Sequence, residues 1–138
     1  MISHVTIGTN DLERAIRFYD AALAPLGLVR GESPWHSWAM WRRPDAYYPM
    51  LWVGRPFDQS AASAGSGWMA AFLAETKAAV REAYEAALAH GGRDEGPPGP
   101  RPWTPSYCGA YVRDPDGNKI HFVWRSEAHE GRPPDPSD

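Results

Sequence analysis

An internal repeat is the feature that most constrains the fold of this chain. Residues 4–28 and 69–93 are similar, and the segment Tyr19-Asp20-Ala21-Ala22-Leu23-Ala24 returns as Tyr84-Glu85-Ala86-Ala87-Leu88-Ala89, an offset of 84 − 19 = 65 residues. A chain of 138 residues has room for only two copies. The repeat therefore predicts two similar supersecondary units related by a pseudo-twofold axis, with a cleft on that axis as the natural place for a site.

Composition and charge exclude several classes of protein. The chain is 43% hydrophobic and 22% charged, a balance typical of globular domains. Its net charge of −3 argues against nucleic-acid binding. There is no apolar stretch of ~18 residues that could span a membrane, and the first residues do not resemble a signal peptide. With Cys108 as the single cysteine, we expect a cytoplasmic protein that binds neither membranes nor nucleic acid.

The first unit is expected over residues 1–54 as one strand, one helix and three further strands. Val5 and Ile7 alternate with His4 and Thr6, so the two pairs should lie on opposite faces of the first strand. Asn10 and Glu13 have the spacing of a capping box at the start of the helix. Three shorter strands are expected at Leu28–Arg30, Ser37–Arg42 and Tyr48–Val53.

Residues 55–67 are rich in Ser, Ala and Gly and are expected to link the units. The second unit is then expected over residues 68–125, and residues 126–138 are expected to be a disordered tail. Within this unit we expect strands at 68–73 and 93–96, a helix over 77–90, a loop through the prolines of 97–100, and a hairpin of 107–113 with 119–124. Alternation places Ile120, Phe122 and Trp124 toward the helix and His121 on the other face, as for His4.

Three motifs carry a resemblance to a known superfamily. They are Ile2-Ser3-His4-Val5-Thr6-Ile7, Asn10-Asp11-Leu12-Glu13-Arg14-Ala15 with Phe18-Tyr19, and Tyr111 to Ile120 with its Asp114-Pro115-Asp116-Gly117-Asn118 turn. The chain resembles the vicinal oxygen chelate superfamily of glyoxalase I, bleomycin-resistance proteins and extradiol dioxygenases. The segment 96–102 also resembles a glyoxalase-like bacterial subgroup. The resemblance implies an α+β fold in which two βαβββ repeats form a curved mixed sheet around a concave cleft, with the helices outside.

The resemblance also implies four metal-ligand positions, one from the first and one from the last strand of each unit. In this chain they fall on His4, about Leu51, Met69 and His121. Only the two histidines are good ligands, whereas a catalytic zinc site normally has three protein ligands. A divalent metal (Zn, Ni, Fe or Mn) held by His4 and His121, with waters or a third ligand such as His36, is one hypothesis. Catalysis by these histidines without a metal is the second.

Aromatic residues suggest a binding pocket. Seven tryptophans are present, and several fall in the expected strands of the first unit. We expect Trp38, Trp52, Met69 and Tyr107 to line the pocket, which suits a flat or ring-bearing ligand. Four arginines, Arg42, Arg43, Arg101 and Arg113, are candidate anchors for a carboxylate or phosphate.

Two functions remain open from the sequence. One is a glyoxalase-like protein acting on a small organic molecule, as a metal-dependent lyase or a dioxygenase relative. The other is a non-catalytic protein that binds or sequesters a small molecule, of the bleomycin-resistance type. Because members of the superfamily commonly dimerise and the Trp-rich strands are apolar, we expect a homodimer in either case.

Overall fold

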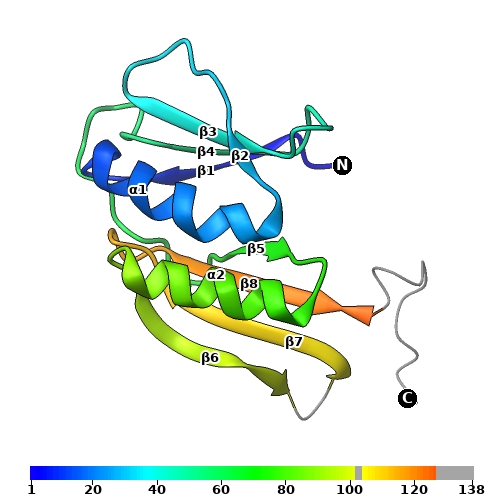
Figure 1. Cartoon of the computed structure of the whole chain (residues 1–138). Coiled ribbons are helices and arrows are strands. Elements are labelled where there is room, and N and C mark those ends of the chain that lie inside the picture. Colours follow the sequence, from blue (N-terminus) through cyan, green and yellow to red (C-terminus); the bar gives the residue numbers. More distant parts are fainter. Residues whose placement is uncertain (102–103, 127–138) are drawn as a thin grey trace.

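The computed structural model describes residues 1–101 and 104–126 and shows two successive βαβββ units (Figure 1). The first unit consists of β1 (His4–Gly8), α1 (Leu12–Leu23), the short 3-10 helix η1 (Ala24–Leu26), β2 (Val29–Arg30), β3 (Trp38–Arg42) and β4 (Met50–Gly54). The second consists of β5 (Ala70–Leu73), α2 (Lys77–Ala89), β6 (Arg93–Arg101), β7 (Thr104–Arg113) and β8 (Lys119–Arg125).

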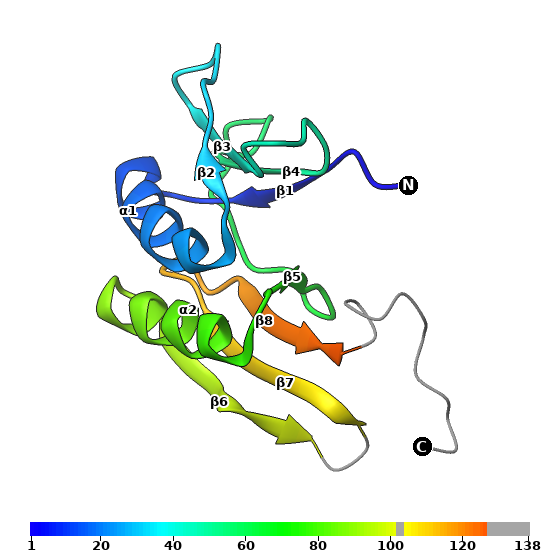
Figure 2. The ribbon, with the colours of Figure 1, turned by 45° about the vertical axis from the view of Figure 1, so that its right-hand side comes forward.

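The strands of the two units have the same order and directions. The first sheet runs β1-β4-β3-β2 and the second runs β5-β8-β7-β6. In each, the first strand pairs in parallel with the last one: Val5 lies opposite Leu51, and Ala70 lies opposite Ile120. These matching registers confirm the α+β fold of two βαβββ repeats. The strands form two separately hydrogen-bonded mixed sheets, with α1 and α2 side by side (Figures 1 and 2).

The core lies between each helix and its sheet. Ile7 is buried and Val5 packs against the core, whereas His4 is exposed on the opposite face of β1. In β8, Ile120 and Phe122 are fully buried under α2. The alternation expected for both strands is therefore confirmed, and each sheet has one face that no helix covers.

The start of α1 differs from the expected capping box. Asp11, not Asn10, is the N-cap residue, and its carboxylate accepts a hydrogen bond from the Arg14 amide (3.0 Å). Asn10 instead binds the backbone of Ala62, donating to its carbonyl (3.0 Å) and accepting from its amide (2.7 Å). Asn10 thus fixes the connection between the units, a role that local spacing does not reveal.

Strand β6 corrects the expected proline loop. The residues from Pro97 to Pro100 belong to this strand, although its pairing with β7 shifts register between Asp94 and Gly96, Gly96 and Gly99, and Gly99 and Arg101. Proline lacks the amide proton that a central strand needs. Because β6 is the edge strand of its sheet, the backbone on its solvent side needs no partner strand. Prolines are tolerated on that side, where a missing amide proton breaks no hydrogen bond of the sheet.

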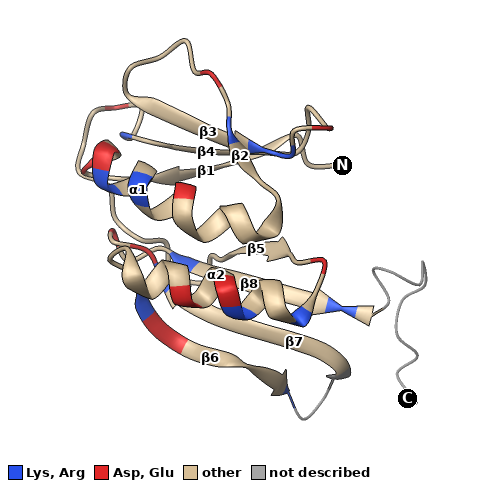
Figure 3. Cartoon of the chain, viewed as in Figure 1, with Lys and Arg blue, Asp and Glu red and all other residues tan. Residues whose placement is uncertain are grey.

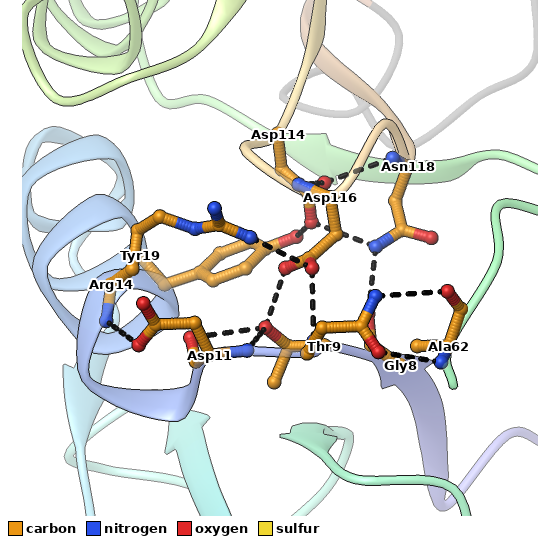
Figure 4. Close-up of polar contacts among 10 residues, drawn as sticks. Gly8, Thr9, Asp11, Arg14, Tyr19, Ala62, Asp114, Asp116 and Asn118 are labelled. Atoms are coloured by element: carbon orange, nitrogen blue, oxygen red, sulfur yellow. Dashed lines mark hydrogen bonds and ion pairs between the residues drawn. The ribbon is translucent and has the colours of Figure 1, made fainter. Parts of the chain in front are cut away.

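The Asp114–Asn118 turn joins the two units (Figure 4). The Asp116 carboxylate accepts hydrogen bonds from the Thr9 hydroxyl (2.5 Å), the Asn10 amide (2.9 Å) and the Arg14 guanidinium (2.9 Å). Figure 4 also shows the Tyr19 hydroxyl donating to Asp114 (2.6 Å) and the Asn118 amide donating to the Gly8 carbonyl (3.0 Å). The turn between β7 and β8 therefore completes the β1–α1 corner of the other unit.

Among the described residues, no helix is long and apolar enough to cross a membrane.

Candidate functional site

A cavity of about 1170 Å³ lies against the uncovered face of the first sheet. Its floor is formed by alternating residues of β1 and β4, namely His4, Thr6, Gly8, Met50 and Trp52. Trp35, Trp38 and Tyr48 also line it. The cavity belongs to the first unit and the connection that follows it, whereas the site expected on the axis between the repeats stays a prediction.

Aromatic side chains dominate the walls of this cavity. The rings of Trp35 and Trp52 meet edge to face with centroids 5.5 Å apart. Trp35 remains 58% exposed, and Phe57, which also lines the cavity, is 98% exposed. The described lining includes no Asp, Glu, Lys or Arg. Such a surface favours an uncharged ring, because aromatic contacts release water without requiring a charge to be desolvated.

The connection between the units forms one wall, which sequence reasoning assigned only to a linker. Pro56, Phe57 and residues 59–63 line the cavity. The connection is held in place by the two hydrogen bonds between Asn10 and Ala62. It also lies very close to Gly8, where an added Cβ would be 2.9 Å from the Cβ of Ala62. The small residues of the sequence could have indicated this contact, because Gly8 and Ala62 have side chains small enough to let the connection lie against β1.

His4 is the titratable residue on the cavity floor. It is exposed, and its Nδ1 lies 2.8 Å from the Ser3 hydroxyl. A neutral imidazole at this place can offer one donor and one acceptor to a ligand. His4, Trp38 and Trp52 are therefore the predicted site residues that the structure brings together.

His121 lies on the uncovered face of the second sheet in a different environment. It is 4% exposed, and its Nε2 lies 2.5 Å from the Tyr107 hydroxyl. The Tyr111 ring stacks on the imidazole at 4.2 Å, with 7° between the planes. Burial, followed by the charges of Arg125, Arg101 and Lys119, lowers the pKa of His121 from 6.5 to about 4.

The Tyr107 hydroxyl is bonded to both His121 and Tyr111. Its pKa is raised, chiefly by burial and then by the hydrogen bond with Tyr111. With a pKa of about 4, His121 is neutral at physiological pH, and its Nε2 shares one hydrogen bond with the Tyr107 hydroxyl. Tyr107 therefore holds His121 in the protein interior instead of lining the aromatic cavity.

Met69 lies apart from both groups. It is 37% exposed and borders a small cavity of about 340 Å³ that Arg113 and Lys119 also line. The repeat alignment that placed a ligand position at about Leu51 is also corrected by the register. Leu51 is buried toward the helix, and Trp52 holds the position equivalent to His121, since Val5 pairs with Leu51 as Ala70 pairs with Ile120.

The residues present do not fit a resident metal within one chain. Among residues 1–101 and 104–126, no group of three His, Cys, Asp or Glu side chains is placed to hold a metal. His4 and His121 belong to different sheets, and the Nε2 of His121 is already engaged in a hydrogen bond with Tyr107. His36 borders another cavity. A metal shared by His4 and His121 stays a prediction from the resemblance.

The fold consists of two βαβββ units, and each unit has one sheet face that no helix covers. Comparison with known proteins identifies the family. The model of the Glyoxalase/Bleomycin resistance protein/Dioxygenase superfamily matches residues 1–122, so the chain belongs to this superfamily. No curated protein matches the chain. A glyoxalase/bleomycin resistance protein from Albidiferax ferrireducens T118 is 35% identical, with a TM-score of 0.79, over 91% of this chain and 98% of that one.

Two more distant solved structures share the fold. A glyoxalase-related enzyme from Fulvimarina pelagi is 22% identical with a TM-score of 0.69, over 91% of this chain and 88% of that one. A glyoxalase/bleomycin resistance protein/dioxygenase family enzyme from Burkholderia phytofirmans PsJN is 20% identical with a TM-score of 0.67, over 89% and 97% of the two chains.

Proposed function

We propose that the protein binds a small, flat, uncharged organic molecule in the aromatic cavity of its first unit. The observation that carries the proposal is the wall of Trp35, Trp38, Tyr48 and Trp52 without a charged side chain in the described lining. Ligand sites are typically concave and mostly apolar, with a few polar groups that orient the ligand. His4, Ser3 and Thr6 supply such groups on the floor of the cavity.

The size of the cavity supports a ligand larger than a two- or three-carbon metabolite. Its volume of about 1170 Å³ exceeds the usual range of roughly 300–1,000 Å³ for drug-sized ligands. An aromatic ligand of one or two rings can lie on the floor of the cavity beside the Trp35–Trp52 pair. Binding without turnover, as in a bleomycin-resistance type of protein, is the function that this surface supports best.

The test is a titration with naphthol, followed by quenching of tryptophan fluorescence and by calorimetry, with cyclohexanol as the nonaromatic comparison. We expect naphthol to bind more tightly than cyclohexanol. Trp52→Ala should weaken naphthol binding about tenfold, because aromatic contacts contribute beyond their buried area. Tyr47→Ala removes an exposed aromatic residue outside the cavity and should leave the affinity unchanged. Equal affinities for the wild type and Trp52→Ala would refute the proposal.

His4 favours a second candidate function, metal-free proton transfer on the bound ligand. Its imidazole lines the same cavity, and an imidazole at hydrogen-bond distance from a bound ligand can act as a general acid or base. If the protein is an enzyme of this kind, His4→Ala abolishes turnover of a bound compound while leaving its affinity within a fewfold of the wild type. Unchanged turnover by His4→Ala would exclude this role.

We also propose that the chain forms a homodimer. Trp35, Tyr47, Tyr48 and Phe57 leave large hydrophobic side chains exposed beside the cavity. A second copy that covers this apolar rim would bury it, as clustered exposed apolar residues favour association. Light scattering after size-exclusion chromatography should give twice the 15.3 kDa chain mass. A single-chain mass at micromolar concentration would exclude the dimer.

A further inference from the structure

The uncovered face of the second sheet carries a separate group of side chains. Neighbouring strands place Tyr107 opposite Arg125 and Tyr111 opposite His121 in the β7–β8 ladder. Lys119, His121 and Arg125 alternate along β8 and therefore share this face. Figure 3 shows basic residues near both ends of β8 and at the end of β6.

Three cations gather over the two tyrosine rings of this face. The Arg101 guanidinium carbon lies 5.3 Å from the centroid of Tyr111, and the Lys119 Nζ lies 5.2 Å from the same centroid. The Arg125 guanidinium carbon lies 5.2 Å from the centroid of Tyr107. Each distance is within the range of a cation–π contact. Since the Tyr107 and Tyr111 hydroxyls share a hydrogen bond (3.2 Å), the three cations flank one pair of tyrosines.

Within residues 1–101 and 104–126, Arg101 and Lys119 are not held in ion pairs of their own, although Lys119 lies close enough to the Glu95 carboxylate to help lower its pKa. In the described part of the chain, neither forms a salt bridge, whereas Arg113 on the same face is paired with Glu95 at 2.9 Å. The charges that act on His121 come from Arg125, Arg101 and Lys119, and all three oppose its protonation. Positive charge is therefore in excess beside His121, and an anion placed there would be electrostatically favoured.

We propose that this face binds the oxyanion group of a small ligand, a carboxylate or a phosphate ester, between Arg101, Lys119 and Arg125. Arginine and lysine donors form charge-assisted hydrogen bonds with such groups. Tyr107 and Tyr111 hold the positions of the cations through their rings. The hydrogen bond between His121 Nε2 and the Tyr107 hydroxyl anchors the tyrosine pair to β8. The site is distinct from the aromatic cavity, whose described lining contains none of these residues.

The test is a titration of the isotope-labelled full chain with benzoate, phenyl phosphate and benzyl alcohol, followed by amide chemical shifts. We expect at least one of the two anions to shift the amides of residues 107–113 and 119–125, with an affinity that falls as salt is added. The neutral alcohol should shift them much less. Comparison of benzoate with phenyl phosphate identifies the preferred oxyanion.

Substitutions separate a site from a general surface charge. Arg101→Met and Lys119→Met should each weaken anion binding about tenfold, the scale expected for a lost charge-assisted hydrogen bond. Arg81→Met, which removes an exposed cation from α2, should not change it. Amide spectra of each variant without ligand check that it is folded. Equal weakening by all three substitutions, or no shift with either anion at millimolar concentration, would overturn the proposal.

Discussion

The two units share a backbone and differ on the face that no helix covers. In the first unit this face is hollow and aromatic, with Trp52 on its floor. In the second unit the equivalent position is His121, which is buried under Tyr107 and Tyr111 and surrounded by cations. The helix-facing positions stay apolar in both, as Leu51 and Ile120 show. The two units therefore both keep apolar side chains where the helix covers the sheet, and they differ in the side chains on the uncovered face.

The largest expected effect on stability comes from removing the hydrogen bonds that join the two units at Asp116. Asp116→Ala removes the acceptor of three hydrogen bonds from the first unit and leaves the Arg14 charge without its partner. Because the Asp116 side chain is 3% exposed and hydrogen bonds to a buried charged acceptor are lost together, we expect a loss of roughly 3–5 kcal/mol in the free energy of unfolding. Urea denaturation measures it.

A matched control for this prediction is Asp45→Ala, which breaks the exposed ion pair with Arg43 inside the first unit. Exposed pairs contribute little to stability, so its denaturation midpoint should match the wild type. If Asp116→Ala and Asp45→Ala unfold alike, the turn does not join the units.

The next largest effect is a dependence of the free energy of unfolding on pH, which we expect to arise from His121 in the second unit. His121 has a folded pKa of about 4 and an ordinary value of 6.5, so the unfolded chain binds more protons between these values. Above pH 6.5, His121 is neutral in both states and does not lower the free energy of unfolding. As the pH falls from 6.5 toward 4, protonation of His121 in the unfolded chain lowers the free energy of unfolding by roughly 3 kcal/mol in total. His121→Gln should flatten this part of the stability profile, measured by urea denaturation at several pH values.

His90 provides the comparison for that experiment, because it is an exposed histidine at the end of α2. His90→Gln should keep the wild-type dependence on pH. A profile for His121→Gln that parallels the wild type would show that burial of His121 does not govern this pH range.

The smallest effect concerns the wall of the first cavity. Gly8→Ala places a methyl group 2.9 Å from the Cβ of Ala62, so the connection between the units must shift. We expect a loss of stability of about 1 kcal/mol and weaker binding of naphthol, measured by thermal denaturation and calorimetry. Gly99→Ala, where an added Cβ would have only the end of Arg101 at 4.0 Å among the described residues, should leave naphthol binding unchanged. Tighter naphthol binding by Gly8→Ala would contradict this account of the wall.

The sequence was sufficient for the parts of the fold that depend on local periodicity. The repeat predicted two equivalent units, and alternation in β1 and β8 placed His4 and His121 on the uncovered faces. Local rules failed at β6, because whether prolines are tolerated depends on the strand's position at the edge of the sheet. They failed again at Asn10, whose partner Ala62 is distant in the sequence.

The candidate sites were predicted only in part. Aromatic enrichment identified Trp38 and Trp52 as cavity residues, which the structure brings together with His4. It did not identify the wall at Phe57, because a segment rich in small residues is typical of a linker. Tyr107 was expected in the pocket, but cross-strand register places it against His121. Such a register depends on pairing between distant segments, which a single sequence does not define.

The turn at Asp114–Asn118 also has a consequence for the order in which the protein is completed during synthesis. The carboxylate that binds Thr9, Asn10 and Arg14 is made more than a hundred residues after the start of α1. A nascent chain that ends before Asp116 therefore has an unfinished corner in its first unit. The first unit reaches its full stability only after the turn between β7 and β8 has been synthesised.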